Sequence, residues 1–384
     1  MLELTHQLNG DTVTACIMGR VDSTNSPLLD EKLAAADTAQ RLILDVEGLE
    51  YISSAGLRVI LKYRKKHADL EIVNASTEVY EILDMTGFAE MMSVKRAYRR
   101  VSVEGCEVIG EGAKGRVYRT DPDTVVKVYF DSDSLADIEH EREVARKALV
   151  LGIPTAISYD VVKVDGCYAS MFEMVNAASF SKLLAKHPEE VDKYAAMYVD
   201  LLKLIHSTDV PAGQLPSRKL FMQERLKAAE PALPAEVYAK LWSMLDAVPE
   251  TGKMIHGDYH TKNLMLANDE VILIDMDTLS VGHPILEMGS IYNAYIGFHL
   301  LDPAGVEDFL GIGAETAKRL WQDTLRLYYG TEDETELAFR EKQAAIVGII
   351  NLLRRSIVKT RDQKLTDFYA AELCRLASEV DTLL

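Results

Sequence analysis

Paired cysteines and long apolar runs are missing from this sequence, and each absence excludes a class of protein. The four cysteines lie far apart and form no Cys-x-x-Cys pair, so we expect neither a zinc site nor a disulfide framework. The apolar runs, such as 344–353, are shorter than the roughly 20 residues that a membrane-spanning helix needs. The first residues do not combine a basic region with an apolar one, so no signal peptide is expected. We expect a cytoplasmic protein without a membrane span.

Positive charge is also in short supply. Lysine and arginine number 42 against 60 acidic residues, which gives a formal net charge of −18 at pH 7. Such an excess of acid argues against nonspecific binding to DNA or to an anionic membrane surface, so we expect no nucleic-acid partner. The chain of 384 residues is too long for one ordinary hydrophobic core, and about two or three domains are expected.

The first hundred residues alternate β-type runs with helical spacing. Two β-rich runs, 2–8 and 12–18, are joined by Asn9-Gly10-Asp11, which is a strong hairpin signal. Strands and helices then take turns, and this order indicates a mostly parallel sheet with packed helices. The expected strands are 42–46 and 70–74, and the expected helices are 23–37, 55–67 and 79–92.

This segment resembles a STAS domain, the family of bacterial anti-sigma factor antagonists. The resemblance covers roughly residues 1–98 and rests on Gly19-Arg20-Val21-Asp22, 42–45, Tyr51-Ile52-Ser53-Ser54-Ala55-Gly56-Leu57-Arg58 and Gly87-Phe88. It implies that Ser54 is a regulatory phosphorylation site and that an anti-sigma factor or another STAS partner protein binds here. A helix N-terminus tolerates a phosphate, whose charge of about −2 changes any docking surface nearby. As an alternative, serines before a helix are common caps, and Ser53 is a candidate for that role.

A glycine-rich segment opens the second part of the chain. Gly110, Gly112 and Gly115 form a G-x-G-x-x-G pattern, which alone is a weak signal. The following run, through Val117, is β-like, and the next run carries Lys127 between two valines. A glycine-rich hairpin followed by a strand lysine is the arrangement of kinases. Glycines let the backbone approach the phosphates, and Lys127 would neutralise their charge.

Such a lysine needs a carboxylate to hold it. The expected helix 134–151 offers Glu141 as the better partner and Glu143 as the alternative. Two further strands, 156–164 and 168–174, lead into a possible hinge whose backbone would bind the nucleobase, although a plain buried strand explains the same residues. The expected nucleotide-binding residues are therefore Gly110, Gly112, Gly115, Val117, Lys127, Glu141, Glu173 and Val175.

Polar side chains crowd the segment 254–278, and they carry a second resemblance. His256-Gly257-Asp258-Tyr259-His260-Thr261-Lys262-Asn263 resembles the HGDxHxxN signature of the aminoglycoside phosphotransferase/choline kinase-like family, and Ile272-Leu273-Ile274-Asp275 resembles its metal-binding strand end. The resemblance spans about 105 to at least 300. It implies that Asp258 is catalytic and that the cofactors are ATP and Mg²⁺, with Asn263 and Asp275 as the oxygen ligands that magnesium prefers.

The remaining polar residues of this region have less defined roles. His256 and His260 are expected to brace the loop, and Asp277 either lies near a second metal or caps the next turn. The chain departs from the family at Glu287, where many relatives have an aspartate. It also lacks the HRD, DFG and APE motifs of protein kinases. The helical C-terminal region carries Arg354, Arg355 and Lys359, which either contact an acceptor or face solvent.

The patterns together predict an α/β STAS-type domain at 1–98, a sheet with packed helices, followed by an α+β, two-lobed kinase-like domain at 99–384. The nucleotide lobe would span 99–175 and the helical catalytic lobe 176–384. The leading hypothesis is an ATP- and Mg-dependent phosphotransferase for a small-molecule hydroxyl or amino acceptor, regulated by its STAS domain. One alternative is a protein-directed kinase or partner-switching regulator phosphorylated at Ser54. Another is a module that senses nucleotide without catalysis.

Overall fold

The computed structural model describes residues 2–112, 114–132, 134–174 and 177–384. The chain forms two compact units, Met1–Gly105 with Val161–Ala169, and Cys106–Asp160 with Ser170–Leu384. The segment Val161–Ala169 falls in the first unit because backbone hydrogen bonds join Lys163 to Arg99 and Val101. No helix in these described ranges combines the length and the apolar character that crossing a membrane requires.

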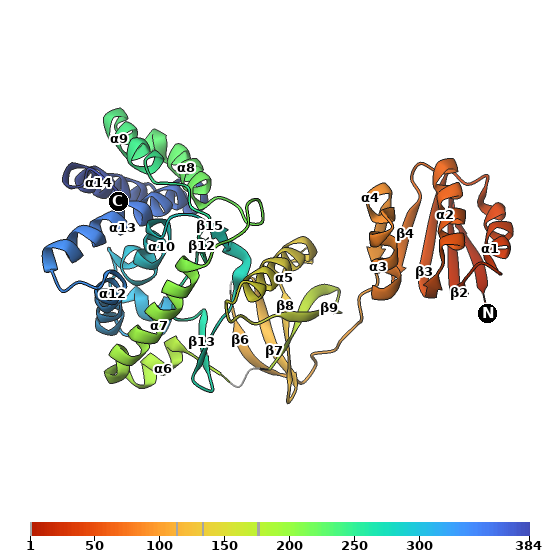
Figure 1. The fold of residues 1–384 in the computed structure, drawn as a ribbon, viewed down its shortest axis with the longest axis horizontal. Coiled ribbons are helices and arrows are strands. Elements are labelled where there is room, and N and C mark those ends of the chain that lie inside the picture. The colour runs from red at the N-terminus through yellow and green to blue at the C-terminus, as the bar shows by residue number, and fades with distance from the viewer. Residues whose placement is uncertain (1, 113, 133, 175–176) are drawn as a thin grey trace. The chain divides into compact units, whose positions relative to one another are not determined.

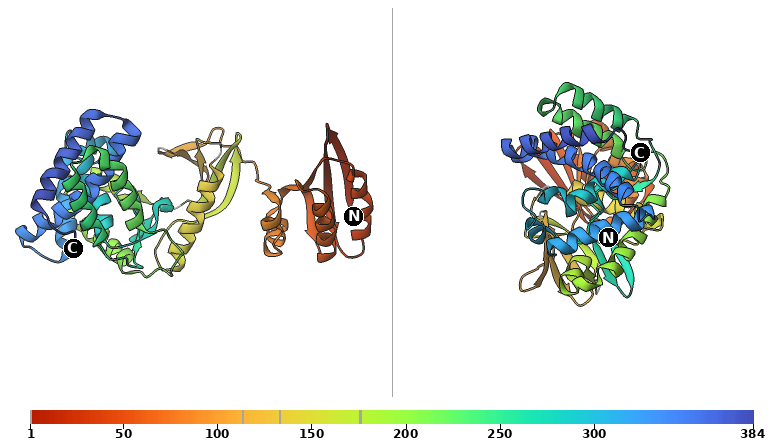
Figure 2. Two further views of the ribbon diagram at one scale, coloured as in Figure 1. Left: turned by 90° about the horizontal axis from the view of Figure 1, so that it is seen from above. Right: turned by 90° about the vertical axis from the view of Figure 1, so that its left-hand side faces the viewer.

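The N-terminal unit is built on a five-stranded sheet in the order β1-β2-β3-β4-β5. The first pair is antiparallel, as the hairpin signal predicts, and the other pairs are parallel. The helices lie on one side of the sheet (Figures 1 and 2). The elements are β1 (Glu3–Asn9), β2 (Thr12–Val21), α1 (Ser26–Leu33), a 3₁₀ turn (Ala34–Ala36), β3 (Arg41–Ile52), α2 (Ser54–Lys66), β4 (Glu71–Ala75), α3 (Thr77–Met85), α4 (Phe88–Met91) and β5 (Ser93–Arg96).

One predicted element of this unit is wrong in extent. The spacing predicts a single helix over 79–92, but the structure has two, α3 and α4, separated at Thr86 and Gly87. Gly87 has a φ of 77°, a left-handed conformation that ends a right-handed helix and that glycine adopts at little cost. Strand β5, which follows, is not among the predicted strands.

The second unit begins with a β-rich lobe. Its five-stranded sheet has the order β6-β7-β8-β10-β9, with β6-β7 and β7-β8 paired as antiparallel hairpins. The bounds are β6 (Glu107–Glu111), β7 (Gly115–Asp121), β8 (Thr124–Tyr129), α5 (Leu135–Val150), β9 (Ser158–Val164) and β10 (Cys167–Glu173). Helix α5, the long helix in the described part of this lobe, carries the two candidate partners of Lys127.

The rest of the unit is a helical lobe with two small sheets, β11-β13-β14 and β12-β15 (Figure 1). Its helices are α6 (Phe180–Lys186), α7 (Val191–Ser207), α8 (Arg218–Ala229), α9 (Ala235–Asp246), α10 (Ile285–Tyr295), α11 (Gly305–Leu310), α12 (Ala314–Tyr329), α13 (Glu334–Arg355) and α14 (Gln363–Glu379). Short helical turns are Pro188–Glu190, Glu230–Ala232, η4 (Met276–Thr278), Gly297–His299 and Ser356–Thr360. The strands are β11 (Ala178–Ser179), β12 (Met254–Ile255), β13 (Leu264–Ala267), β14 (Glu270–Leu273) and β15 (Ser280–Val281).

Helices α10 and α13 form the centre of this lobe and cross at two glycines. A Cβ atom on Gly289 of α10 would lie 2.5 Å from Val347 Cγ1, and one on Gly348 of α13 would lie 2.7 Å from the carbonyl oxygen of Gly289. The backbones therefore approach more closely than any larger residue would allow. Almost every residue of α10 is buried, so its position is fixed by packing. This helix begins two residues before Glu287, which contacts the candidate catalytic loop.

Candidate active site

The candidate catalytic residue, Asp258, lies in the loop between β12 and β13. Its side chain is 50% exposed, and His260 Nε2 lies 3.6 Å from its Oδ2 atom. Burial works to raise the pKa of Asp258, but His260 and Arg218 outweigh it, and the pKa lies below its usual value. Asp258 is therefore a carboxylate at neutral pH, which is the form that can accept a proton.

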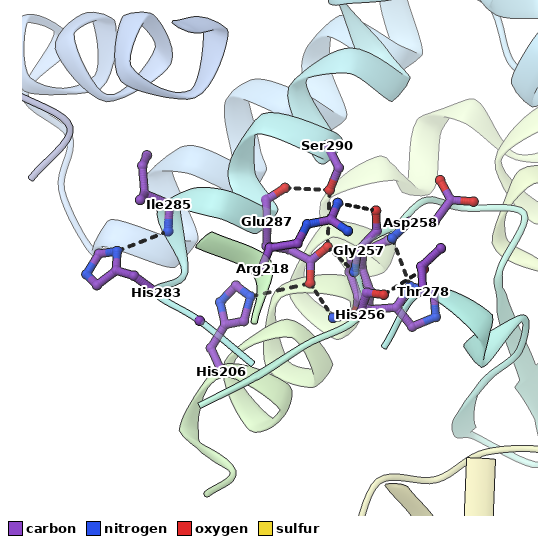
Figure 3. A network of polar contacts seen from close by, with 12 residues as sticks. His206, Arg218, His256, Gly257, Asp258, Thr278, His283, Ile285, Glu287 and Ser290 are labelled. Atoms are coloured by element: carbon purple, nitrogen blue, oxygen red, sulfur yellow. Dashed lines mark hydrogen bonds and ion pairs between the residues drawn. The ribbon is translucent and has the colours of Figure 1, made fainter. Parts of the chain in front are cut away.

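A buried carboxylate on α10 holds the backbone of this loop (Figure 3). Glu287 accepts hydrogen bonds from the backbone N–H groups of His256 at 2.6 Å and Gly257 at 2.8 Å. His206 lies 3.7 Å from the same carboxylate. Burial works to raise the pKa of Glu287, but His206 and other positive groups lower it below its usual value. The glutamate at this departure from the family pattern therefore braces the loop.

Arg218, the first residue of α8, contacts the loop from another side. Its Nη2 atom donates to the carbonyl oxygen of Gly257 at 3.0 Å. Gly257 has a φ of 90°, and a Cβ atom there would lie 2.7 Å from the Thr278 carbonyl oxygen and 2.8 Å from Arg218 Nη1. Both the conformation and the space therefore require glycine at this position. Neither Arg218 nor His206 is among the residues singled out by the sequence, since both lie far from the motif along the chain.

The two histidines of the motif differ in their contacts. The ring of His256 is fully buried, and its Nδ1 atom accepts a hydrogen bond from the backbone N–H of Asp258 at 3.2 Å. Its carbonyl oxygen accepts one from the Thr278 hydroxyl at 2.7 Å. His256 is thus enclosed in the loop, whereas His260 reaches the Asp258 carboxylate.

A backbone hydrogen bond holds the two segments that carry the expected magnesium ligands next to each other. The N–H of Ile274, next to Asp275, donates to the carbonyl oxygen of Asn263 at 2.9 Å. Asn263 uses its Nδ2 atom to bond the carbonyl oxygen of Asp258, also at 2.9 Å, which leaves its amide oxygen to accept a further partner. Asp275 itself has a φ of 64°, a conformation uncommon for a residue other than glycine.

The electrostatics of Asp275 fit a bound cation. Burial raises the pKa of Asp275, Lys127 works against that shift, and the negative charges of Asp277 and other nearby acids add to it. A group of mutually repelling carboxylates is stabilised by a divalent cation, and carboxylate and amide oxygens are suitable ligands for Mg²⁺. The residues present therefore fit the metal that the sequence motif implies, with Asn263 and Asp275 as the donors.

Lys127 of β8 pairs with Glu141 of α5. Its Nζ atom lies 3.1 Å and 3.2 Å from the two carboxylate oxygens, and the Tyr129 hydroxyl donates to the same carboxylate at 2.8 Å. Burial works to lower the pKa of Lys127, but the negative charge of Glu141 and other neighbours raises it well above its usual value. The alternative partner, Glu143, instead pairs with Lys147 at 2.6 Å.

The glycine-rich segment lies in the same sheet as Lys127, with β7 between β6 and β8. Val117 of β7 is the cross-strand partner of both Gly110 and Lys127. The turn between β6 and β7 is closed by a backbone hydrogen bond from Gly112 to Gly115 at 2.9 Å. The pairing therefore brings the three glycines and Val117 to the same part of the sheet as Lys127.

Lys114 links this glycine-rich segment to the segment after Asp275. Its ammonium group forms a hydrogen-bonded ion pair with Asp277. Burial works to lower the pKa of Lys114, but Asp277 more than offsets it and the pKa is raised. Lys114 is absent from the sequence-predicted site because its partner is 163 residues away along the chain.

The residues expected to form the hinge and the phosphorylation site are mostly exposed. Glu173 is exposed at the end of β10, and Val175 lies outside the described residues. Ser54 is exposed at the first position of α2. Ser53 occupies the N-cap position, but its side chain makes no capping hydrogen bond.

Two protein-family models match the chain. A model described as the phosphotransferase enzyme family matches residues 105–323, which is more than half of the chain. The chain belongs to this phosphotransferase family. A model of the STAS domain matches residues 6–102, so the phosphotransferase also carries the N-terminal domain that its first hundred residues predict.

Individual relatives match one part of the phosphotransferase each. The putative anti-sigma factor antagonist BtrV of Bordetella bronchiseptica is 34% identical over 99 residues, which are 24% of this chain and 85% of that protein. A crystal structure of a thermostable mutant of aminoglycoside phosphotransferase APH(4)-Ia with ADP and hygromycin B has a TM-score of 0.50 at 13% identity, covering 72% of this chain and 94% of that one. A second structure of APH(4)-Ia also has a TM-score of 0.50, at 13% identity over 71% of this chain and 93% of that one.

These comparisons confirm the predicted fold class, which joins a STAS-type sheet domain to a kinase-like fold with a β-rich lobe and a helical lobe. They also confirm that the protein is a phosphotransferase with a domain of the anti-sigma factor antagonist type.

Proposed function

We propose that this phosphotransferase transfers the γ-phosphate of Mg–ATP to a hydroxyl or amino group of a small-molecule acceptor. Residues 99–384 would form the catalytic domain, with the nucleotide lobe at 99–175 and the helical lobe at 176–384. Residues 1–98 would form the regulatory STAS domain, which binds a partner protein.

One observation carries this proposal. The partly buried pair Lys127–Glu141 contributes its charges to the same electrostatic environment as Asp275, although Asp275 lies more than 130 residues further along the chain than either partner. A cation held next to repelling carboxylates is the arrangement that a metal–nucleotide complex requires, because phosphates need a lysine and the metal needs acids. A purely structural role for the Lys127–Glu141 ion pair would not explain why the Asp258 carboxylate and the Asn263 amide oxygen are available to bind further partners.

The residues divide the reaction between them. Lys127 would neutralise the α- and β-phosphates, and Glu141 keeps its ammonium group in place. Asp258 would orient an acceptor hydroxyl and take its proton as the acceptor oxygen bonds to the γ-phosphorus and the bond to the β–γ bridging oxygen breaks, which releases ADP. Bound Mg²⁺, held by Asn263 and Asp275, would neutralise phosphate charge. The brace from Glu287 would keep Asp258 at a constant position.

ATP turnover in the presence of a panel of small acceptors tests this proposal. We expect Asp258→Asn to lower kcat by roughly 100- to 10,000-fold, the usual contribution of a general base, with the KM for ATP nearly unchanged. Asp269→Asn is a matched control, because it removes the same charge from an exposed aspartate in the turn between β13 and β14. Undiminished transfer by Asp258→Asn would contradict the assigned role, and nucleotide binding without transfer to any acceptor or to water would contradict the function.

A second target is supported by the surroundings of Ser54. Its side chain is exposed at the N-terminus of α2, where a phosphate would meet free backbone N–H groups. In this case the phosphotransferase acts on its own STAS domain or on that of another copy. Intact-mass and peptide analysis after incubation with Mg–ATP should find one added phosphate, lost in Ser54→Ala and kept in Ser53→Ala. Equal labelling of wild type and Ser54→Ala would rule out this serine as a target.

A further inference from the structure

Two arginines, Arg225 of α8 and Arg354 of α13, lie near the place where these helices meet in the helical lobe. Met222 of α8 and Asn351 of α13 touch, with Asn351 Nδ2 lying 3.4 Å from Met222 Sδ. Arg225 follows Met222 by three residues, and Arg354 follows Asn351 by three, so each arginine lies one helical turn beyond that contact. Both arginines are half-buried. The two positive charges are near enough that the charge of Arg354 lowers the pKa of Arg225.

These charges have no acidic partner among the described residues. The chain has 60 acidic side chains, yet none in the described ranges forms an ion pair or hydrogen bond with Arg225 or Arg354. The Nε atom of Arg225 is buried without a hydrogen-bond acceptor, and its guanidinium lies 3.8 Å from the centre of the Phe221 ring. Burial and the positive charges of Arg354 and Arg218 lower the pKa of Arg225 to about 10, so it is still charged at neutral pH.

The cluster is connected to the candidate catalytic loop through α8. Arg218, at the start of this helix, donates to the carbonyl oxygen next to Asp258. Its guanidinium lies 4.7 Å from the centre of the Phe221 ring, which also contacts Arg225. Arg218 and Arg225 are seven residues apart and share one face of the helix, which places them roughly 10 Å apart along its axis. This distance is within the length of a small metabolite.

Unpaired like charges in a half-buried position destabilise a protein unless an anion compensates them. Guanidinium groups bind carboxylates and phosphates especially well, because their N–H groups match two oxygens at once. The chain as a whole is acidic, so a local excess of positive charge is not a general property of its surface. Arg225 lies roughly 10 Å along α8 from Arg218, which bonds the residue before Asp258, so the positive cluster is suited to the far end of an acceptor.

We propose that Arg225 and Arg354 bind an anionic group of the phosphate acceptor, so that the acceptor is a small hydroxyl compound with a carboxylate or phosphate at its other end. This proposal rests on the phosphotransfer function proposed above and names its substrate class. It predicts that a polycationic acceptor such as hygromycin B, the ligand seen in the structure of APH(4)-Ia, is a poor substrate for this phosphotransferase.

Binding is tested with the full chain and its nucleotide site filled by a non-hydrolysable ATP analogue and Mg²⁺, so that a phosphate probe does not bind there. Calorimetric titrations use glycerol 3-phosphate and glycerate as anionic probes and glycerol as their neutral counterpart. We expect wild type to bind at least one anionic probe and not glycerol. Arg225→Gln and Arg354→Gln should each weaken that binding by roughly tenfold or more, as expected for loss of a charged hydrogen bond. Lys227→Gln is the matched control, because Lys227 is an exposed cation on the same helix.

The outcomes separate this proposal from the function on which it rests. If wild type binds no anionic probe, or if the arginine variants bind it as tightly as Lys227→Gln does, the anionic subsite is wrong, whatever the ATP turnover shows. If hygromycin B or glycerol is phosphorylated in preference to the anionic probes, the subsite is also wrong while phosphotransfer stands. If the probes bind through the arginines but no variant or wild type ever transfers phosphate, the subsite stands and the catalytic function fails.

Discussion

Replacing Glu287 should show how much the phosphotransferase depends on one buried carboxylate. This side chain accepts two backbone hydrogen bonds from the loop that carries Asp258, at 2.6 Å and 2.8 Å, and it is fully buried. Glu287→Gln keeps one acceptor oxygen, but it turns an amide N–H₂ towards the other backbone N–H. The lost charged hydrogen bond and the unpaired N–H together correspond to about 2 to 4 kcal/mol of unfolding free energy.

The same change should slow the reaction, because the loop loses its fixed position. A displacement of about 1 Å at a reacting group can cost roughly 100-fold in rate, so we expect a fall in kcat of about that size. Glu287→Asp keeps the charge on a shorter side chain and should lie between wild type and Glu287→Gln in both properties. Urea unfolding and ATP turnover measure the two effects. Glu307→Gln is the control, because Glu307 is exposed on α11.

The pH dependence gives an independent check of the same carboxylate. The folded-state pKa of Glu287 is lowered from 4.5, so its stabilisation is complete above that value and is lost as the pH falls through the lower folded-state pKa. The stability difference between wild type and Glu287→Gln should therefore be constant near neutral pH and shrink below about pH 4.5. A glutamine variant as stable and as active as Glu307→Gln at neutral pH would refute the proposed brace.

Three other perturbations have definite expected results. Glu141→Gln should raise the KM for ATP by roughly tenfold, since Lys127 loses a charged partner, whereas Glu143→Gln should leave it unchanged in the same steady-state assay. Gly257→Ala should lower the unfolding free energy by about 2 kcal/mol or more, because it combines a positive φ with two contacts under 3 Å. Gly252→Ala, with an ordinary φ and its nearest neighbour 3.5 Å away, should be nearly neutral in the same urea titration. Removal of Mg²⁺ with EDTA should abolish ATP turnover, and addition of excess magnesium should restore it. Turnover that persists in EDTA would contradict a metal-dependent reaction.

Short spacings support most of what the sequence predicts about the fold and the candidate site. The run from His256 to Asn263 lies in one loop, so its residue types and intervals alone indicate the chemistry. Lys127 and Glu141 are also within reach of sequence reasoning, because a charged residue on an apolar strand implies a partner on the next helix. The division of 79–92 into two helices was missed, although Gly87 was visible as a residue suited to a left-handed turn.

What the sequence could not predict depends on packing between distant segments. The contact of Arg218 with Gly257 joins residues 39 positions apart, and the ion pair of Lys114 with Asp277 joins residues 163 apart. Lys114 occupies a variable position of the glycine-rich pattern and Arg218 belongs to no motif, so no sequence pattern identifies the distant partner of either residue. The proximity of Arg225 to Arg354 likewise depends on how α8 meets α13, since no local signal distinguishes these arginines from the other basic residues of the chain.

The close crossing of α10 and α13 at two glycines couples the position of Glu287 to the position of Arg354, which an enzyme engineer would want to change separately. Gly289 follows the loop-bracing Glu287 by two residues on α10, and Gly348 precedes Arg354 by six on α13. A substitution that pushed the helices apart would therefore shift both Glu287, which holds the candidate catalytic loop, and Arg354. If the proposed acceptor site is right, acceptor preference would be altered by exchanging side chains on fixed helices and not by sliding α13, because the loop that carries Asp258 would move with it.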